Sequence, residues 1–380
     1  MIKLIVFGNS NYNTLGVVRG MCSKGVEVFL LLVSTSHFNT VILSKGVKEY
    51  KRVDDEEKGV AFLLDKKDAW KDAVILPTSD KAESALDMNF DKLFLYYRFP
   101  HAKKQGMVNS LMDKCLQLKL AANAGLHVPV TVRYRKGSPL PEGIAYPCIA
   151  KPQNSTTGQK GIMHICRDKV ELLQTLEVSH HVDDFLLQQY INKEYEVLLI
   201  GCRLPDNRIW IPGVFKKERW YLKGGDASYG IISTQLDEFF SQQTEVCTFI
   251  EKLNYYGPFS VEFGVMNGIP YFYEINLRND GTSHYFHKAG IFIPYIHYLA
   301  NIGKLKEVDL TVPRLCNYTF IDEFGDLVNL RETKLSFRQW WYDVCHASAY
   351  KYFQAGDLKP FLAITPRRVV TSFYRLFKFY

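Results

Sequence analysis

Apolar and polar residues alternate in blocks along the first third of the chain. Short apolar runs lie at 3–7, 26–33 and 73–76, and stretches with helical spacing lie at 17–24 and 81–89. Gly25 follows the first of these stretches, at the position where a helix usually ends. Strands that alternate with helices are typical of a parallel sheet whose ligand edge lies at the carboxyl ends of the strands. The pattern therefore predicts an α/β fold that opens with a Rossmann-like domain over residues 1–103.

The turn after the first predicted strand, at 8–16, reads Gly-Asn-Ser-Asn-Tyr-Asn-Thr-Leu-Gly. It lacks the G-x-G-x-x-G spacing that brings the backbone against a dinucleotide pyrophosphate. An oxidoreductase of the Rossmann type is therefore disfavoured.

The middle of the chain is rich in predicted strands. A helix is expected over 105–124, short strands at 130–134, 148–151, 163–166 and 185–190, and a helix at 168–177. Strands then dominate from 194 to 277 apart from a helix near 242–253, and an amphipathic stretch covers 285–302. Boundaries near 103 and 304 divide the chain into three parts.

The most informative segment runs from Tyr255 to Arg278. Its Asn-Gly pair lies between two alternating apolar runs and predicts a hairpin turn. Glu262 lies in the first strand, and Glu274, Asn276 and Arg278 alternate along the second, so these three share one face. Two carboxylates and an amide oxygen suit Mg²⁺, and the arginine would neutralise a phosphate or a carboxylate. A salt-bridged structural hairpin is the alternative, although it does not require Asn276 on that face.

Two weaker motifs precede the hairpin. Lys151 ends a predicted strand and is followed by a loop of small and hydroxyl residues at 153–161, which can hold phosphate by charge and backbone N–H groups. It is not a Walker A motif, and an exposed surface hairpin is the alternative. The segment 185–201 joins two apolar strands and carries Glu194 and Glu196. Its main chain could face an adenine, and a glutamate could accept ribose hydroxyls.

The order of these motifs resembles the ATP-grasp superfamily over roughly residues 105–300. The order is a helix-borne lysine in Met-Asp-Lys-Cys, a strand lysine with a glycine-bearing loop, a hinge followed by a glutamate, and the Glu…Glu-x-Asn-x-Arg hairpin. The resemblance implies a two-lobed ATP-grasp domain at 104–303, with a small lid lobe at about 128–190 and a C-terminal extension at 304–380. The first turn, the Leu-Pro-Thr-Ser-Asp segment and the tail look most like the branch with D-aspartate ligases and carboxylate–amine ligases related to carbamoyl phosphate synthase.

The resemblance implies roles for individual residues, with ATP and one or two Mg²⁺ ions, replaceable by Mn²⁺, as cofactors. The residues matched to nucleotide binding are Lys114, Lys151, Gln189, Tyr190, Ile191 and Glu196, with Glu194 as the alternative for ribose. The residues matched to the metal are Glu262, Glu274 and Asn276. Arg278 and Lys216 are matched to catalysis, and Lys217, Arg219 and Lys223 are the other candidates for the γ-phosphate. Gln188 stands where these enzymes often have Glu.

The implied reaction is ADP-forming ligation of a small carboxylate, expected to be an amino acid, to an amine through an acylphosphate. A bicarbonate-using carboxylase or carbamoyl-type enzyme is one alternative, and a non-catalytic ATP-binding regulatory protein is another. His284 and His287 lie three residues apart and could bind metal, but such a pair without a third ligand is more often structural.

Composition adds the expected compartment. The chain is 47 % hydrophobic and 23 % charged, as in ordinary folded proteins. Its eight cysteines include no C-x-x-C pair, which argues against a structural zinc site and a secreted disulfide framework. The first apolar run is too short for a signal peptide, and no apolar run approaches the ~18 residues of a membrane span. A cytoplasmic protein is predicted.

Charge is concentrated at one end of the chain. Residues 331–380 carry +6 of the formal net charge of +7, together with thirteen aromatic residues. A nucleic-acid binder would spread its basic residues over its working surface, so no nucleic acid partner is expected. The tail, above all 366–380, suits an anionic lipid surface. It predicts peripheral contact with the inner face of the membrane and an acceptor on a lipid-linked envelope precursor. A terminal domain with aromatic core is the alternative, and an oligomer is left open.

Overall fold

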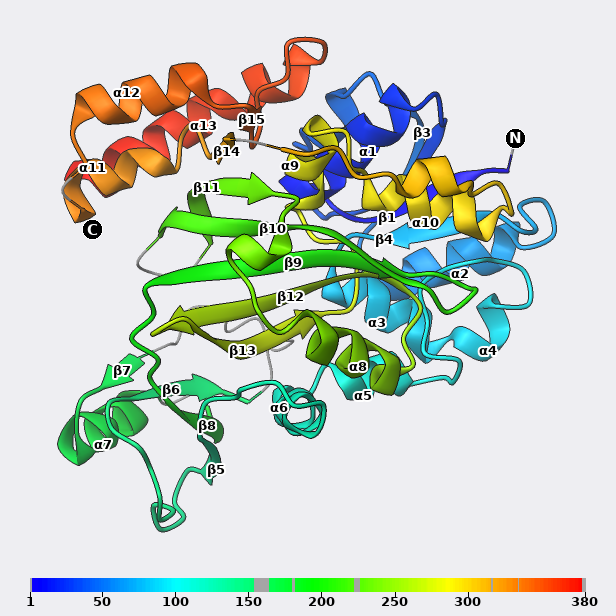
Figure 1. Cartoon of the computed structure of the whole chain (residues 1–380). Coiled ribbons are helices and arrows are strands. Elements are labelled where there is room, and N and C mark those ends of the chain that lie inside the picture. The colour runs from blue at the N-terminus through cyan, green and yellow to red at the C-terminus, as the bar shows by residue number, and fades with distance from the viewer. Residues whose placement is uncertain are drawn as a thin grey trace.

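The protein contains three β-sheets with helices on their faces (Figure 1). The structure, a computed structural model, describes residues 2–153, 164–179, 182–221, 226–315, 317–333 and 335–377. The predicted α/β class is confirmed.

The first sheet is parallel and has the Rossmann strand order β3-β2-β1-β4. Its strands are β1 (Leu4–Asn9), β2 (Val28–Val33), β3 (Val47–Val53) and β4 (Val74–Pro77), with helices α1 (Tyr12–Ser23), α2 (Glu56–Lys66), α3 (Asp80–Met88) and α4 (Phe90–Leu93). Helix α1 begins inside the predicted turn because the side chain of Asn11 accepts a hydrogen bond from the backbone N–H of Thr14. The sequence pattern missed β3 because this edge strand is largely exposed and polar.

The second sheet is the largest, with the order β13-β12-β9-β10-β11-β14-β15. Its strands are β9 (Tyr195–Arg203), β10 (Ile209–Trp220), β11 (Ala227–Ser233), β12 (Gly257–Met266), β13 (Ile269–Asn276), β14 (Tyr318–Ile321) and β15 (Ala349–Tyr350). The strands β14 and β15 come from the C-terminal region, and β14 pairs antiparallel with β11. The sheet is therefore completed by residues beyond 304.

The third sheet forms a small lobe beside the β13 edge of the second (Figure 1). Its order is β5-β8-β6-β7, made of β5 (Thr131–Arg135), β6 (Cys148–Pro152), β7 (His164–Cys166) and β8 (Asp184–Gln189), with helix α7 (Lys169–Val178). The strands and the helix lie within two residues of where the sequence pattern predicts them.

Different helices cover the two faces of the second sheet. Helices α5 (Met107–Leu111), α6 (Lys114–Asn123) and α8 (Gln243–Leu253) share one core with Phe263 and Phe272, and helices α9 (Ser283–Lys288) and α10 (Ile293–Asn301) share another with Phe215. The helix predicted over 105–124 is interrupted at Asp113, whose carboxylate caps α6. The amphipathic stretch 285–302 forms two helices divided at Gly290, which has a positive φ of 89°.

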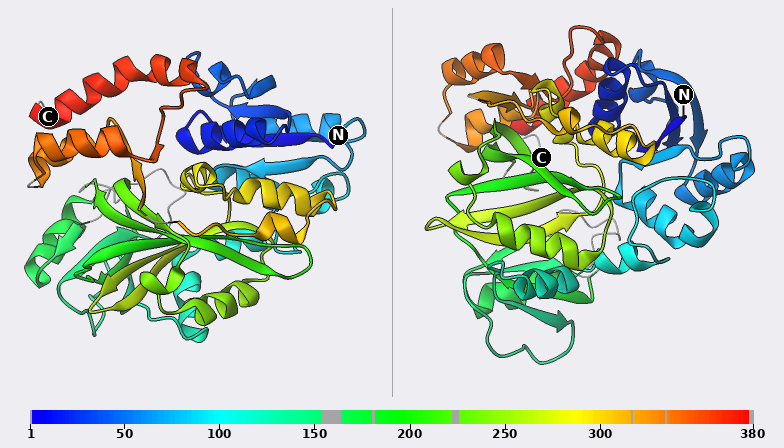
Figure 2. Two further views of the ribbon diagram at one scale, coloured as in Figure 1. Left: turned by 45° about the horizontal axis from the view of Figure 1, so that its top comes forward. Right: turned by 45° about the vertical axis from the view of Figure 1, so that its right-hand side comes forward.

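Helix α10 also belongs to the core of the first sheet. The side chains of Tyr298 and Leu299, and of Phe292 just before the helix, pack with the apolar residues of β1, β2 and β4. The Tyr298 hydroxyl donates to the carbonyl of Ile2 at 2.7 Å. Figure 2 shows α10 lying between the first and second sheets.

The C-terminal region adds helices α11 (Asn329–Glu332), α12 (Phe337–His346) and α13 (Leu358–Phe377). Short 3₁₀ segments lie at η1 (Val41–Leu43), η2 (Leu236–Glu238), η3 (Glu307–Leu310) and η4 (Asp326–Val328). A buried ion pair of 2.9 Å between Arg19 and Asp357 ties the start of α13 to α1. Within the part of the chain that the structure describes, no helix is long and apolar enough to cross a bilayer.

Candidate active site

The two glutamates of the predicted hairpin lie directly opposite each other. In the β12–β13 register Glu262 pairs with Glu274, and Ser260 pairs with Asn276. A bulge follows, because Phe263 pairs with Phe272 and leaves Tyr273 as the extra residue. This extra residue lets Phe272 enter the core beneath the sheet while Glu274 stays on the face of Glu262.

Asn276 and Arg278 continue this face toward the first sheet. The Asn276 amide donates to Ser260 Oγ at 3.2 Å, and Arg278 donates to Asn276 Oδ1 at 3.3 Å. Arg278 also donates to Asp80 at 2.7 Å, and it lies 3.5 Å from Asp280. Burial alone would lower the pKa of Arg278, but the two aspartates raise it above its usual value. Asp80 begins α3 directly after β4, so the arginine joins the hairpin to the edge of the first sheet.

A lysine accompanies each glutamate. Lys114, the first residue of α6, lies 2.9 Å from Glu274. Lys217 on β10 lies 3.0 Å from Glu262 and 2.8 Å from Glu196 on β9. The pKa of Glu262 is raised to about 7, because burial and the facing Glu274 raise it more than Lys217 lowers it. The face is therefore an alternating array of carboxylates and ammonium groups, in which Glu196 and Lys217 are buried and the others are half-buried.

Lys216 does not join this array. Its ammonium lies 2.8 Å from Glu218 and over the rings of Tyr195 and Phe239, on the face of β10 opposite to Lys217. Neighbouring residues of a strand point to opposite faces, so only one of the two lysines can reach Glu262. We therefore replace Lys216 with Lys217 among the candidate residues. The other candidate, Arg219, pairs with Asp326 and Asp343 of the C-terminal region.

Lys151 of the small lobe is held by a chain of hydrogen bonds. Its ammonium donates to Gln188 Oε1 at 2.8 Å, and the Gln188 amide donates to Thr131 Oγ1 at 2.8 Å. Gln188 therefore orients the lysine without neutralising it. Burial, together with the charge of Lys114, lowers the pKa of Lys151 to about 8. Gln153 donates to Asp113 at 3.2 Å and links the end of β6 to the start of α6.

The predicted adenine hinge follows β8. The backbone N–H of Gln189 donates to the carbonyl of Val130 at 2.7 Å, and that of Tyr190 donates to the carbonyl of Pro147 at 2.9 Å. Ile191 is buried, and its carbonyl accepts from the N–H of Lys193. The two N–H groups are thus engaged within the lobe, so an adenine would meet other main-chain groups of this segment.

The two candidate ribose glutamates have different surroundings. Glu194 is exposed and accepts a hydrogen bond from the backbone N–H of Asn267 in the hairpin turn at 3.0 Å. Glu196 is buried and is paired with Lys217 and also with Lys193. The lysines lower the pKa of Glu196 against the effect of burial. Only Glu196 belongs to the array around Glu262.

The donor set fits a magnesium ion shared with a ligand. Like charges directly opposite each other in a sheet are unfavourable unless a cation lies between or beside them. Here two carboxylates and the oxygen of Asn276 line one face, and Mg²⁺ takes few protein carboxylates and completes its six ligands with phosphates and water. Among the described residues, no group of three or more His, Cys, Asp or Glu side chains is arranged to hold a metal on its own.

The two histidines after the hairpin lie elsewhere. His284 is buried against Gly16 of α1, and His287 lies 3.0 Å from Ser23 at the end of that helix. Burial lowers the pKa of both, that of His287 to about 4. They pack α9 against α1 and do not face the glutamates. Lys223 and all but Gln153 of the loop expected to hold phosphate at 153–161 lie outside the described residues.

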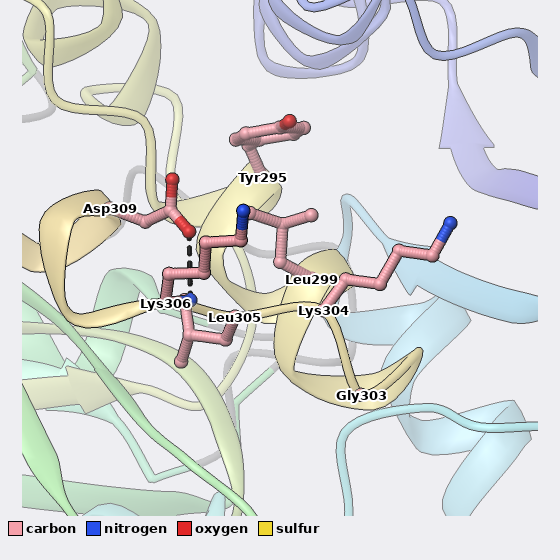
Figure 3. A pocket seen from close by; sticks show the side chains of 7 residues that line it. All are labelled: Tyr295, Leu299, Gly303, Lys304, Leu305, Lys306 and Asp309. Carbon is pink, nitrogen blue, oxygen red and sulfur yellow. Dashed lines mark hydrogen bonds between the residues drawn. The ribbon is translucent and has the colours of Figure 1, made fainter.

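A surface pocket lies at the end of α10 (Figure 3). It is lined by Tyr295, Leu299, Gly303, Lys304, Leu305, Lys306 and Asp309, and the Lys306 N–H donates to Asp309 at 2.8 Å. No candidate residue lines it.

Sequence reasoning missed three participants. They are Lys193, Asp80 and Asp280, which contact candidate residues but lie outside the hairpin segment 255–278. The position of Asp80 after a buried strand is the signal that could have found it, because the carboxyl ends of parallel strands carry ligand-facing residues.

Comparison with solved structures identifies the fold. N5-carboxyaminoimidazole synthetase from Staphylococcus aureus superimposes with a TM-score of 0.69 at 18% identity, over 88% of this chain and 85% of that one. An L-amino acid ligase from Bacillus licheniformis gives 0.64 at 15% identity, over 83% and 78%. The biotin carboxylase domain of a Hydrogenobacter thermophilus 2-oxoglutarate carboxylase, in complex with MgADP, ADP and bicarbonate, gives 0.64 at 15%, over 81% and 71%.

The chain therefore has the ATP-grasp fold that these structures share. No family model matches the sequence, and no curated protein matches it.

Proposed function

We propose that the protein is an ATP-dependent, ADP-forming ligase that joins a small carboxylate to an amine. The observation that carries this proposal is the pair Glu262 and Glu274, directly opposite each other with a lysine beside each. The pair lies on a fold shared with a synthetase, an amino acid ligase and a carboxylase domain. A structural hairpin needs no such accumulation of partly buried charge, because ion pairs taken out of water are at best weakly stabilising.

The proposal assigns the residues as follows. Glu262, Glu274 and Asn276 would hold Mg²⁺, which supplies charge neutralisation on the phosphates when bound. The ATP phosphates would meet three ammonium groups, those of Lys114, Lys151 and Lys217. The adenosine would lie against the segment Gln189–Ile191, with Glu196 toward the ribose. Arg278 would face the transferred phosphate or the substrate carboxylate, as a planar fork fits either anion.

The reaction needs no protein nucleophile. A substrate carboxylate oxygen attacks the γ-phosphorus, the new O–P bond forms, and the bond to the β-phosphate oxygen breaks to release ADP. The amine nitrogen then attacks the acyl carbon, the C–O bond to phosphate breaks, and the nitrogen loses a proton. Positioning and charge stabilisation would supply most of the acceleration.

We further propose that the carboxylate is an amino acid and that the amine belongs to a cell-envelope precursor, as in the D-aspartate ligase branch. The first part is supported by the likeness to an L-amino acid ligase. The second rests on the basic, aromatic C-terminal region. Bicarbonate is the second candidate for the activated acid, because a bicarbonate complex of a carboxylase domain shares the fold.

Glu274→Gln tests the proposal. The variant keeps the size of the side chain but removes one charge from the paired carboxylates, so ADP release should fall at least about a hundredfold. ADP release would be measured over a panel of amino acids with and without amines, and with bicarbonate alone. The matched control is Glu251→Gln, an exposed glutamate on α8, which should leave the rate unchanged.

The outcomes separate the candidates. Wild-type turnover in a folded Glu274→Gln protein would contradict the metal assignment. ADP release with bicarbonate and no amine would favour the carboxylase. Binding of Mg-ATP without ADP release for any pair in the panel would favour a regulatory protein.

A further inference from the structure

Helix α13 exposes an apolar face. Leu358, Leu362 and Val369 are spaced four and seven residues apart and so lie on one side of the helix, and Val370 and Tyr374 lie farther round it. All five side chains are exposed, Leu362 to 62%. A surface helix normally keeps most of its large apolar side chains on the core side, so five exposed ones on α13 are unusual.

The neighbouring face of α13 packs against the body of the protein. Phe361 stacks on Phe324 with ring centroids 5.6 Å apart, and Ser372 donates to the carbonyl of Phe324 at 2.8 Å. Arg368 donates to the hydroxyl of Tyr352. These contacts fix the orientation of the helix. The exposed apolar side chains are therefore held outward by a well-packed helix.

Helix α12 repeats the pattern. Its outward residues Phe337, Trp341 and Tyr342 are all more than half exposed, and Phe337 and Trp341 stack at 6.5 Å. Trp340 on the other side of the helix is buried. In both views of Figure 2 the two helices lie on the side of the second sheet away from the small lobe.

The exposed charge of this region is positive. Arg338, Lys359 and Arg367 are exposed. Two acids of the same fifty residues point inward: Asp343 pairs with Arg219, and Asp357 pairs with Arg19. Their negative charge is neutralised inside the protein, so it does not offset the basic residues outside.

We propose that the outer face of α13, assisted by α12, docks on the surface of an anionic lipid bilayer. Leucine, valine and aromatic side chains would enter the boundary between headgroups and acyl chains, and the lysine and arginines would meet anionic headgroups. A second copy of the chain would bring the same positive charges against each other. A single-stranded nucleic acid would offer bases that stack on aromatic rings but not on Leu358, Leu362 or Val369.

The docking does not depend on the proposed ligase reaction. If both are correct, the bilayer would hold the enzyme where a lipid-linked amine is presented. Vesicle binding needs neither ATP nor turnover, so a failed docking test and a failed ligase test are distinguishable.

The experiment is co-sedimentation of the full chain with phosphatidylcholine vesicles, with and without phosphatidylglycerol. The wild type should sediment only with the anionic vesicles, and added salt should weaken binding. The double variant Lys359→Glu with Arg367→Glu should lower the partition coefficient at least about tenfold. Leu362→Asp with Val370→Asp should lower it at least about tenfold as well, since both side chains leave the apolar layer.

Matched controls lie on the first domain. Lys92→Glu with Leu95→Asp also changes an exposed basic and an exposed apolar residue, and it should bind as the wild type does. Circular dichroism melting would show that each variant is folded. Equal loss in the control, or no binding of the wild type to anionic vesicles, overturns the proposal. So does a solution dimer that Leu362→Asp dissociates, which would make this face an interface between copies.

Discussion

Neighbouring lysines on β10 have opposite environments, and this difference decides which of them can act. Lys217 is buried between Glu196 and Glu262, whereas Lys216 is paired with Glu218 on the opposite face of β10. The sequence shows two adjacent lysines with no mark to choose between them. Strand register makes the choice, since Lys217 lies beside Glu196 across the β9–β10 pair.

Replacement of each lysine by methionine tests this difference. Lys217→Met leaves the buried Glu196 and the half-buried Glu262 without their shared cation and should cost about 3 kcal/mol of unfolding free energy. Lys216→Met removes one partly exposed pair and should cost about 0–1 kcal/mol. Urea unfolding measures both. The loss in Lys217→Met should shrink as the pH falls below about 7, because Glu262, whose pKa is raised to about 7, becomes protonated and neutral. Equal losses in the two variants would contradict the assignment.

Lys151 makes nucleotide affinity depend on pH. Its pKa is lowered to about 8, so the side chain is charged below that pH and loses its proton above it. Phosphate groups of ATP are already ionised at about pH 7, so only the lysine changes. Affinity for ATP should therefore fall as the pH rises through 8, by up to about tenfold per unit above the pKa. Titration calorimetry at a series of pH values measures the affinity. The control is Lys151→Arg, whose affinity for ATP should not change with pH because arginine stays charged. The same slope in that variant would exclude Lys151.

At the scale of elements, the sequence pattern worked where one side of an element is buried and failed where tertiary contacts decide. The hairpin and the small lobe alternate in the expected way, because the register of buried strands is fixed by their apolar face. The bulge at Tyr273 is absent from that pattern. Edge strand β3 and the C-terminal strands β14 and β15 were missed because they are short or polar, and their pairing partners are distant in sequence.

Helix α10 shows how far apart such partners are. It supplies Tyr298 and Leu299 to the core of the first sheet, and Phe292 just before it lies against Gly20 of α1. No periodicity within residues 1–103 reveals that the sheet needs this cover.

A fragment of residues 1–103 should therefore fail to fold cooperatively. Without α10, the apolar face formed by Leu4, Val6 and Leu30 is covered by α1 alone, and the rest of it stays in water. The fragment should bind a hydrophobic dye and melt without a sharp transition by circular dichroism. In the full chain, Phe292→Ala should lower the unfolding free energy by about 3–5 kcal/mol. A sharp melt of the fragment would show that the first sheet is independent.

At the scale of the molecule, ion pairs join the first domain, the second sheet and the C-terminal region. Arg278 connects the hairpin to Asp80 of the first domain, and Arg219 connects β10 to Asp326 and Asp343 of the C-terminal region. The candidate metal residues could be predicted from sequence because they lie in one hairpin. Their cationic partners could not, because they come from α6, β10 and the small lobe. The net charge likewise does not show that the acids Asp343 and Asp357 are paired inside the protein while basic residues of the same region are exposed.

The place of α10 in the sequence also sets a waiting time during synthesis. The first sheet has all its strands once Pro77 is made, but Phe292 follows about 215 residues later. At ~5–20 residues per second, translation of that interval lasts on the order of 10–40 s. Throughout it the nascent chain carries an apolar sheet face that α1 covers only in part. A general chaperone and the protein's own α10 would then compete for one surface, and slower translation would favour the chaperone.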